Sequence, residues 1–345
     1  MTTAYLNAIG TAVPAYEVHG KFVDYAPRLL ASPRDVRLFA RMADRAGIER
    51  RYSVIAPHPS PERLDRGDLF RPGAFPDTKT RMGLYERHAP DLAFAAALDL
   101  EADLGGTTHL VLASCTGFFA PGLDLDIVER LDLDPGVERT IVGFMGCAAA
   151  INALKVAHHI VRSEQDARVL VVCLELCTLH LQETSDLEQV LSFLIFADGC
   201  AVGLVSAEPR GLALRGFEAA IVPEAADQIT WRIGNSGFDM RLSGEVPATI
   251  GRHLPAILPP RSAGPIALWA IHPGGRTILD AVEKALELPP GGLAFSREIL
   301  RRYGNMSSAT IMFVLKAMLE SGAAGAGCAI SFGPGLTAET MLFEA

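Results

Sequence analysis

Three residues of this sequence stand at the ends of expected elements and could together catalyse acyl transfer. Cys147 opens an amphipathic helix in MGCAAAINALKVAHHIV, His272 closes an apolar strand in ALWAIHPGG, and Asn305 precedes a second helix in YGNMSSATIMFVLKAML. A thiolate is the reactive form of cysteine, and the unpaired N–H groups of a helix N-terminus lower the pKa of a thiol placed there. His can exchange a proton with the thiol, and His and Asn can donate to a developing oxyanion. We therefore expect a depressed pKa for Cys147.

Each of the three also has an ordinary interpretation. A buried, unreactive thiol is as common as a nucleophile at such a position, a histidine in a turn is usually just hydrogen-bonded, and Asn often caps a helix. The order Cys, His, Asn occurs in papain-like proteases as well. Those enzymes carry Cys-Gly-[Ser/Ala]-Cys-[Trp/Tyr] near the mature N-terminus, which Met-Gly-Cys-Ala-Ala deep in this chain does not match. The protease interpretation is the weaker one.

An internal repeat connects the three residues. An apolar strand, a polar residue at the start of an amphipathic helix, and a second strand all recur after 157 to 159 positions. The pairs are 108–115 with 267–275, Cys147 with Asn305, and 167–176 with 327–336. Alternating strands and helices predict parallel βαβ units. We predict an α/β fold of two similar halves, 1–208 with the Cys and 209–345 with the His and Asn, whose central helices begin at one shared cleft.

Further elements are expected in the first half. Residues 33–50 form an amphipathic pattern with Val36, Phe39, Met42 and Ile48 on the apolar side, and 90–103 is a second expected helix. The segment 56–80 is rich in Pro, Gly and charge, so we expect either a surface loop or a lid.

Composition limits the class of protein. The chain has 345 residues, of which 49% are apolar, so it can bury a large core and is not expected to be disordered. With 31 Lys and Arg against 40 Asp and Glu, its net charge of -9 does not favour nucleic acid. Apolar stretches end well short of the roughly 20 residues that span a bilayer, and no signal peptide is expected. We predict a cytoplasmic protein without membrane insertion.

The six cysteines support the same compartment. They form no CxxC pair and no Cys/His pattern with zinc spacing, so we expect neither a metal site nor a disulfide framework. Cys173, Cys200 and Cys328 lie within apolar runs and are expected to be buried and inert.

Motifs along most of the chain resemble type III polyketide synthases, the chalcone synthase-like branch of the thiolase superfamily. They are RMADRAGIERRY (41–52), SCTGFFAPGLDLDIVERLDL (114–133), FMGCAAA (144–150), FADG (196–199), WAIHPGG (269–275), GNMSSAT (304–310) and FGPGLTAET (332–340). The combination of WxxHPGG with GNMSS is specific, because related ketoacyl synthases usually carry other residues after this His and Asn.

The resemblance implies a homodimer of thiolase-like, five-layer αβαβα subunits and an acyltransferase that needs no cofactor beyond coenzyme A thioesters. Cys147 would accept a starter from an acyl-CoA. His272 would hold the thiolate and, with Asn305, stabilise the enolate that forms when malonyl-CoA loses CO2. Repeated two-carbon extension would end in cyclisation to a pyrone, resorcinol or related product.

The family pattern also implies residues around the catalytic ones. Phe196 would be a gatekeeper, and Arg41 and Arg45 would contact CoA phosphates. The remaining expected pocket residues are Met240, Cys115, Thr116, Cys177, His180 and Ser307. Leu38, Ala120 and Ser331 depart from the family pattern, as do several pocket positions, so an aromatic starter is not implied; we favour a fatty acyl starter.

Two other functions stay open at this stage. A ketoacyl synthase III-like enzyme would extend once, from an acyl carrier protein. A thiolase-fold partner subunit would be non-catalytic, against which the intact Cys, His and Asn set argues.

Overall fold

Apolar strands from both halves of the chain form one mixed sheet in the computed structural model, which describes residues 2–258 and 265–345. In spatial order its nine strands are β11 (Leu268–Ile271), β12 (Ala326–Gly333), β13 (Thr337–Glu344), β8 (Leu212–Ile221), β1 (Ala4–Ala12), β7 (Asp198–Ser206), β6 (Val169–Leu176), β4 (His109–Ser114) and β5 (Glu138–Gly143). The pair β4–β6 is parallel and β6–β7 antiparallel, just as β11–β12 is parallel and β12–β13 antiparallel. The repeat expected from the sequence is confirmed, although each half also contains antiparallel pairs.

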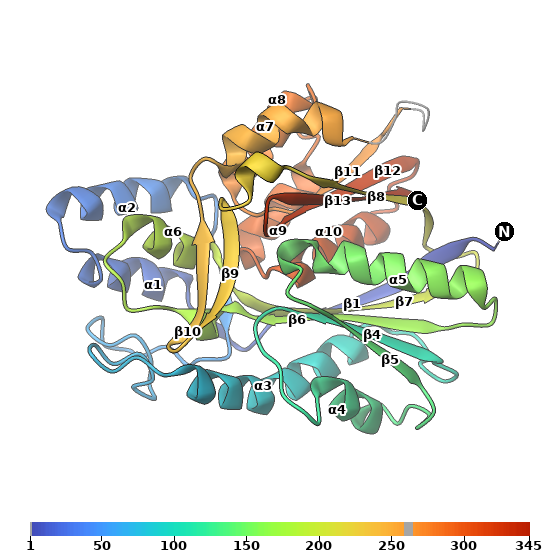
Figure 1. Cartoon of the computed structure of the whole chain (residues 1–345), viewed down its shortest axis with the longest axis horizontal. Helices are drawn as coiled ribbons and strands as arrows, with labels where there is room; N and C mark the ends of the chain where they lie inside the picture. Colours follow the sequence, from blue (N-terminus) through green and yellow to red (C-terminus); the bar gives the residue numbers. More distant parts are fainter. Residues whose placement is uncertain (1, 259–264) are drawn as a thin grey trace.

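Helices alternate with the strands in five layers. The helices are α1 (His19–Tyr25), α2 (Pro33–Arg45), α3 (Thr78–Leu98), α4 (Leu123–Arg130), α5 (Ala149–Ser163), α6 (Leu187–Ile195), α7 (Val246–Ile257), α8 (Arg276–Ala285), α9 (Ala294–Tyr303) and α10 (Ser308–Glu320). Figure 1 shows α7 and α8 above β8 and β11–β13, then α5 and α10, then β1 and β4–β7, with α3 and α4 below. The predicted αβαβα arrangement is thus the observed one.

Helices α5 and α10 occupy the middle layer, where both sets of strands cover them. Their packed residues are fully buried and include a run of small side chains at the start of α5, Ala149, Ala150 and Ala153. Small side chains let helices and strands approach closely. Within the described residues neither helix has a side-chain hydrogen bond at its N-cap, and first-turn N–H groups of both helices donate instead to backbone carbonyl oxygens of the tight turns that precede them.

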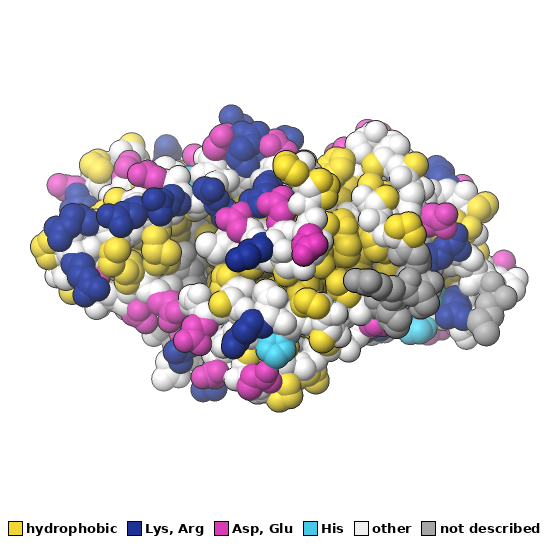
Figure 2. All heavy atoms as spheres, turned by 90° about the horizontal axis from the view of Figure 1, so that it is seen from above, with side chains coloured by type: hydrophobic (Ala, Val, Ile, Leu, Met, Phe, Trp, Pro, Cys, Tyr) yellow, Lys and Arg dark blue, Asp and Glu magenta, His cyan; other side chains and the backbone are white. Residues whose placement is uncertain are grey.

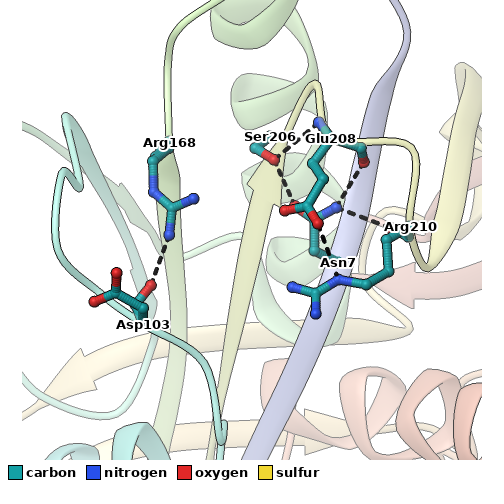
Figure 3. Close-up of polar contacts among 6 residues, drawn as sticks. All are labelled: Asn7, Asp103, Arg168, Ser206, Glu208 and Arg210. Carbon is teal, nitrogen blue, oxygen red and sulfur yellow. Dashed lines mark hydrogen bonds and ion pairs between the residues drawn. The ribbon is translucent and has the colours of Figure 1, made fainter.

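The connection between the halves is held by a side chain of the first strand. Asn7 donates through Nδ2 to the carbonyl oxygens of Glu208 (2.9 Å) and Arg210 (2.8 Å), and its Oδ1 accepts from Ser206 Oγ at 2.7 Å (Figure 3). These bonds fix the turn between β7 and β8. Because β8 then returns along β1, the sheet continues from one half into the other.

Two short antiparallel pairs lie outside the large sheet. β2 (Tyr16–Glu17) pairs with β3 (Tyr52–Ser53), and β9 (Ile229–Gly234) forms a hairpin with β10 (Gly237–Leu242). The β9–β10 hairpin lies beside the shared cleft and contributes to its wall.

The expected helix at 33–50 is shorter in the structure. Its start agrees with the sequence, because Ser32 caps α2 by accepting from the N–H of Asp35 at 3.1 Å. It ends at Arg45, close to Gly47, whose φ of +72° is left-handed. Phe39 is buried as expected, whereas Met42 is exposed.

The expected helix at 90–103 was placed too late. α3 begins at Thr78, where Asp77 accepts from the N–H of Thr80 at 2.8 Å, and ends at Leu98. Pro90 lies inside the helix rather than at its start. Proline usually marks a boundary, and here the surrounding packing overrides that preference.

The segment 56–80 is irregular up to the start of α3, yet part of it is pinned to the body of the protein. The buried carboxylate of Asp65 accepts from the N–H groups of Leu69 and Phe70, both at 2.9 Å. The Phe70 ring packs in a cluster with Phe22 and Phe39. This segment does not line the shared cleft but does line a second cavity next to it.

Candidate functional site

Cys147, His272 and Asn305 line one mainly apolar cavity of about 60 Å³. Cys147 lies in a 3₁₀ turn (Gly146–Ala148) that leads into α5, His272 follows β11, and Asn305 lies shortly before α10. The residues come from both halves of the chain and meet where the two central helices begin. Among the expected pocket residues, those that also line this cavity are Phe196, Met240, Cys115, Thr116, Cys177 and Ser307.

The thiol of Cys147 faces polar atoms of the second half. Its Sγ lies 3.9 Å from Oδ1 of Asn305 and 3.8 Å from Oγ of Ser307. The preceding Gly146 has a φ of +58°, and a Cβ there would lie 2.5 Å from the Cδ of Pro334. Only glycine fits this position, because a side chain would need both a left-handed backbone and the space that the proline ring fills.

The imidazole of His272 is buried and unpaired. Its backbone N–H extends the β11–β12 pairing by donating to the carbonyl oxygen of Ile330 at 2.8 Å. Neither ring nitrogen has a hydrogen-bond partner among residues 2–258 and 265–345. Gly274 passes close to the ring, since a Cβ there would lie 3.6 Å from Cδ2 of His272. A buried polar group without a protein partner costs about 1–3 kcal/mol, and such groups occur at catalytic positions.

The two ends of the Asn305 amide have different partners. Its Oδ1 accepts from the N–H of Ser307 at 2.8 Å and so holds the turn into α10. Its Nδ2 donates to the carbonyl oxygen of Gly274 in a long bond of 3.4 Å, which leaves its second N–H free of that contact. The amide therefore fits both the helix-cap and the oxyanion-donor interpretation of Asn305. Its oxygen organises the helix start, while its nitrogen lies beside the turn that follows His272.

Burial sets the charge state of the Cys–His pair. It raises the pKa of Cys147 to about 12, even though contacts with Ser307 and Asn305 oppose the shift, and it lowers the pKa of His272 to about 3. The depressed thiol pKa expected from the helix N-terminus is wrong in direction. Desolvation outweighs the helix end here, and the cavity favours a neutral thiol beside a neutral imidazole.

A buried carboxylate that the sequence analysis missed lies behind the cavity wall. Glu175 accepts from the N–H of Cys115 (2.9 Å), Oγ1 of Thr116 (2.7 Å) and Oγ of Ser308 (2.6 Å). Its burial raises its pKa to about 7. These bonds join β4, β6 and α10 beneath Cys147, so the hydroxyl of Thr116 is directed toward Glu175.

His180 has a different place from the other expected pocket residues. Its Nε2 lies 2.7 Å from the carbonyl oxygen of Thr116, and its Nδ1 accepts from the N–H of Phe238 at 2.9 Å. The imidazole stacks on the Phe238 ring with centroids 4.3 Å apart and is not among the residues that line the cavity. It lies behind the wall and holds the β9–β10 hairpin in place.

The hairpin contributes a second residue that the sequence did not reveal. Trp231 in β9 pairs with Met240 in β10, and both side chains line the cavity. The indole Nε1 of Trp231 donates to the carbonyl oxygen of Cys115 at 2.7 Å, which fastens the hairpin to the segment after β4. No local sequence signal announces this contact, because its partners lie 116 positions apart.

A cleft of about 540 Å³ leads from the cavity to the surface between α2, α6, α7 and α8. The two spaces share Leu242, Gly274 and Ile278. Arg45 lines the cleft, and so does Arg276, which the sequence analysis had not selected; Arg41 is exposed on α2 but is not part of the lining. Figure 2 shows a row of Lys and Arg side chains over the end of the molecule that carries α2.

A second cavity, also of about 60 Å³, adjoins the first, and its lining is mainly apolar but includes three charged residues. Cys177 and Phe196 line both and form the partition between them. The far side of the second cavity includes Phe22, Leu64 and Phe70.

The described part of the chain has neither a cluster of metal-ligating side chains nor a helix that could cross a membrane. Within residues 2–258 and 265–345, no three His, Cys, Asp or Glu side chains are grouped in a way that could hold a metal ion. In the same ranges, none of the helices combines the length and the apolar character that crossing a membrane requires.

Comparisons with known proteins agree with the geometry. Family models described as the N-terminal and C-terminal domains of chalcone and stilbene synthases match residues 1–209 and 214–345. The chain belongs to the chalcone and stilbene synthase family. As a member of that family of type III polyketide synthases, it is an acyltransferase of the polyketide synthase class.

Relatives and solved structures cover nearly the whole chain. The α-pyrone synthesis polyketide synthase-like protein Pks18 of Mycobacterium tuberculosis is 32% identical over 99% of this chain and 91% of its own length. Bisdemethoxycurcumin synthase of rice, Oryza sativa, is 33% identical over 99% and 92%. The structure of 1,3,6,8-tetrahydroxynaphthalene synthase, a type III polyketide synthase of Streptomyces coelicolor, has a TM-score of 0.87 at 26% identity and covers 100% of this chain and 99% of its own.

The raised thiol pKa has a measurable consequence. Because the pKa of Cys147 lies near 12, little thiolate forms in the neutral range, so we expect alkylation of Cys147 by iodoacetamide to accelerate with pH up to at least about pH 9. Peptide mass spectrometry separates Cys147 from the other five cysteines, all of which are buried. A rate that levels off below about pH 8 would contradict this and restore the depressed pKa expected from the helix N-terminus.

Proposed function

We propose that this type III polyketide synthase loads an acyl-CoA starter on Cys147 and extends it repeatedly with malonyl-CoA. The observation that carries the proposal is the meeting of Cys147, His272 and Asn305 in one buried cavity at the inner end of an arginine-lined cleft. The cleft suits an extended thioester whose phosphates stay near the surface, and the cavity suits its acyl end.

The first step is transfer of the starter to the thiol. Since the resting pair is neutral, the proton of Cys147 passes to His272 as the sulfur attacks the thioester carbonyl. The carbon–sulfur bond to CoA breaks, and CoA leaves with a proton. The thiol proton is accepted by a ring nitrogen of His272, which has no hydrogen-bond partner among the described residues.

The second step generates the carbon nucleophile. Malonyl-CoA loses CO2, and the electron pair of the broken carbon–carbon bond forms an enolate whose oxygen needs hydrogen-bond donors. Nδ2 of Asn305 and a ring N–H of His272 are the candidate donors. The enolate carbon attacks the carbonyl of the Cys147 thioester, and the carbon–sulfur bond to Cys147 breaks as the new carbon–carbon bond forms. The thiol recovers its proton, and the extended chain is left on CoA until it is loaded on Cys147 again. Because loss of CO2 supplies the electron pair, the step requires no metal or further cofactor.

The starter that fits best is an apolar acyl chain. The reaction cavity is lined mainly by apolar side chains, and a second apolar cavity lies behind Cys177 and Phe196. A fatty acyl tail can displace these two side chains and enter that space. Pyrones or resorcinols are then the expected products, in line with the pyrone synthesis named for Pks18.

The homodimer is part of the proposal. β5 is the last strand of the sheet and has no partner on its outer side within the described ranges, and apolar side chains next to it are exposed. They include Ile141 at 58% exposure and Phe118 at 55%. An open edge with apolar side chains favours pairing with another chain, and a second copy of this chain is the self-complementary occupant. The cytoplasmic location stays a prediction from the sequence.

Replacing the nucleophile tests the reaction. Cys147→Ala should abolish every product from malonyl-CoA and a panel of acyl-CoAs of increasing chain length, because no thioester can form. Cys328→Ala, in a buried strand away from the cavity, should retain the product pattern. Mass spectrometry of the products is the measurement.

The same assay separates the alternatives. Triketides or longer products from wild type support the proposal, whereas a single extension favours the ketoacyl synthase III-like enzyme. Undiminished turnover by Cys147→Ala would refute the role of the thiol, and a wild-type chain that never becomes acylated would favour a non-catalytic partner subunit. If the enzyme accepts only short aromatic starters, the proposal that the starter is an apolar acyl chain is wrong.

Binding of CoA can be tested on α2. Arg45→Ala should raise KM for malonyl-CoA roughly threefold to fivefold with little change in kcat, because an exposed ionic contact contributes up to about 1 kcal/mol. Arg34→Ala removes the same charge from an exposed position of the same helix that does not line the cleft. Equal KM changes in the two variants would show that only the overall charge of α2 matters.

The dimer can be tested at the sheet edge. Ile141→Asp puts a charge on the proposed interface and should halve the mass measured by analytical ultracentrifugation. Ile221→Asp makes the same change at another exposed strand position and should leave the mass unaltered. A wild-type monomer, or a dimer that survives Ile141→Asp, would rule out this interface.

A further inference from the structure

Arg51 is a buried arginine beside the catalytic region and has no assigned role. It directly precedes β3, only 2% of it is exposed, and it lines the second cavity rather than the reaction cavity. Its Nε donates to Nδ1 of His19 at 3.1 Å, and its Cζ lies 5.3 Å from the ring centroid of Phe22. Both of these partners belong to α1, so one side of the guanidinium is anchored to the N-terminal helix.

The other side of the guanidinium reaches the gatekeeper. Nη1 of Arg51 donates to the backbone carbonyl oxygen of Phe196, while Nη2 has no hydrogen-bond partner in the part of the chain that the structure describes. The charge is retained, because burial lowers the pKa of Arg51 only to about 10. Burying a cation is costly, and the nearby carboxylates of Glu17 and Asp198 offset only part of that cost, since burial is the largest influence on the pKa of Arg51.

The segment that Arg51 holds is paired with the segment of the catalytic Asn. The N–H of Asn305 donates to the carbonyl oxygen of Ile195 at 2.8 Å, and the N–H of Ala197 donates to the carbonyl oxygen of Asn305 at 2.9 Å. These two bonds form a parallel bridge centred on Phe196 and Asn305. The carbonyl that Arg51 binds is therefore located between the two bonds that fix the main chain of Asn305.

The stem of Arg51 touches the same place from another side. A Cβ on Gly304 would lie 2.8 Å from Cγ of Arg51 and 2.8 Å from the carbonyl oxygen of Ile195. Gly304 also has a φ of +68°, so it is confined to glycine by backbone and by space. Arg51 thus supports the residue before Asn305 with its stem and the residue paired with Asn305 with its head.

We propose that Arg51 is a positioning residue that sets where the Asn305 amide and the Phe196 ring lie in the reaction cavity. The inference rests on the proposed function, since it assigns Asn305 to the enolate oxygen of the decarboxylation step. The main chain at Cys147 is held by other contacts, on a turn where the N–H of Gly146 donates to Sγ of Cys115 at 3.1 Å. Loss of Arg51 should therefore impair decarboxylation more than loading of the thiol.

The two half-reactions can be measured separately. Loading is followed by intact-protein mass spectrometry with acetyl-CoA alone, whose acyl group is too short to reach the second cavity that Arg51 lines, and decarboxylation by the release of acetyl-CoA from malonyl-CoA alone. Arg51→Met should lower kcat of decarboxylation at least tenfold, while KM and the loading rate stay within about twofold of wild type. Asn305→Ala should show the same selective loss of decarboxylation. Arg51→Lys keeps a donor for the Phe196 carbonyl and should recover part of the loss. Arg50→Met, an exposed neighbour, is the matched control and should behave as wild type.

The loss of decarboxylation relative to the loss of loading tests whether Arg51 is a positioning residue. Equal losses of loading and decarboxylation in Arg51→Met, or no loss in either, would overturn the positioning role. If Arg51→Met does not fold, the same ratio is read from Arg51→Lys, where a selective loss supports the role and an equal loss or no loss overturns it. A wild-type protein that loads an acyl group but releases no acetyl-CoA would instead overturn the proposed function.

Discussion

The close packing of α5 and α10 in the middle layer is the constraint on which the site depends. Small side chains at the start of α5 let the two helices and the strands of both halves share one core. The turns that precede the two helices line the same cavity. A change in how the two helices meet would separate the thiol on one from the amide before the other, however well each half folded alone.

Burial determines the charge states of the groups in this site, and it also costs free energy, because it leaves a polar group unpaired. The cavity keeps Cys147 and His272 uncharged and leaves the imidazole without a partner. A donor that is already positioned in a mainly apolar cavity can stabilise a charge that appears only during the reaction, because the donor does not have to reorient first. Glu175 lies behind the wall with three hydrogen bonds, and it fixes the floor of the cavity rather than facing the substrate.

The sequence predicted those parts of the site that follow from a repeat. Cys147 and Asn305 could be found because each opens an equivalent helix, and His272 because its strand recurs in the first half. Trp231, Glu175 and Arg51 could not, since each is placed by contacts with residues 59 to 145 positions away.

The thiol pKa shows a related limit of sequence reasoning. The sequence places Cys147 at a helix start, but only the packed structure shows how strongly burial desolvates its thiol. The expected helix at 90–103 starts too late for a different reason. Pro90 is a strong local signal for a helix start, but in α3 tertiary packing overrides that signal. Local patterns thus predicted element types well, while desolvation and distant contacts required the fold.

Covalent growth of a chain on Cys147 is the central claim, and it can be observed directly. Wild-type protein is mixed with a fatty acyl-CoA and then with limiting malonyl-CoA, quenched in acid and digested, and the Cys147 peptide is analysed by mass spectrometry. The account predicts a starter adduct on this peptide followed by a series of heavier adducts, each longer by one two-carbon ketide unit. Products that accumulate while the Cys147 peptide stays unmodified, or adducts on another cysteine, would contradict it.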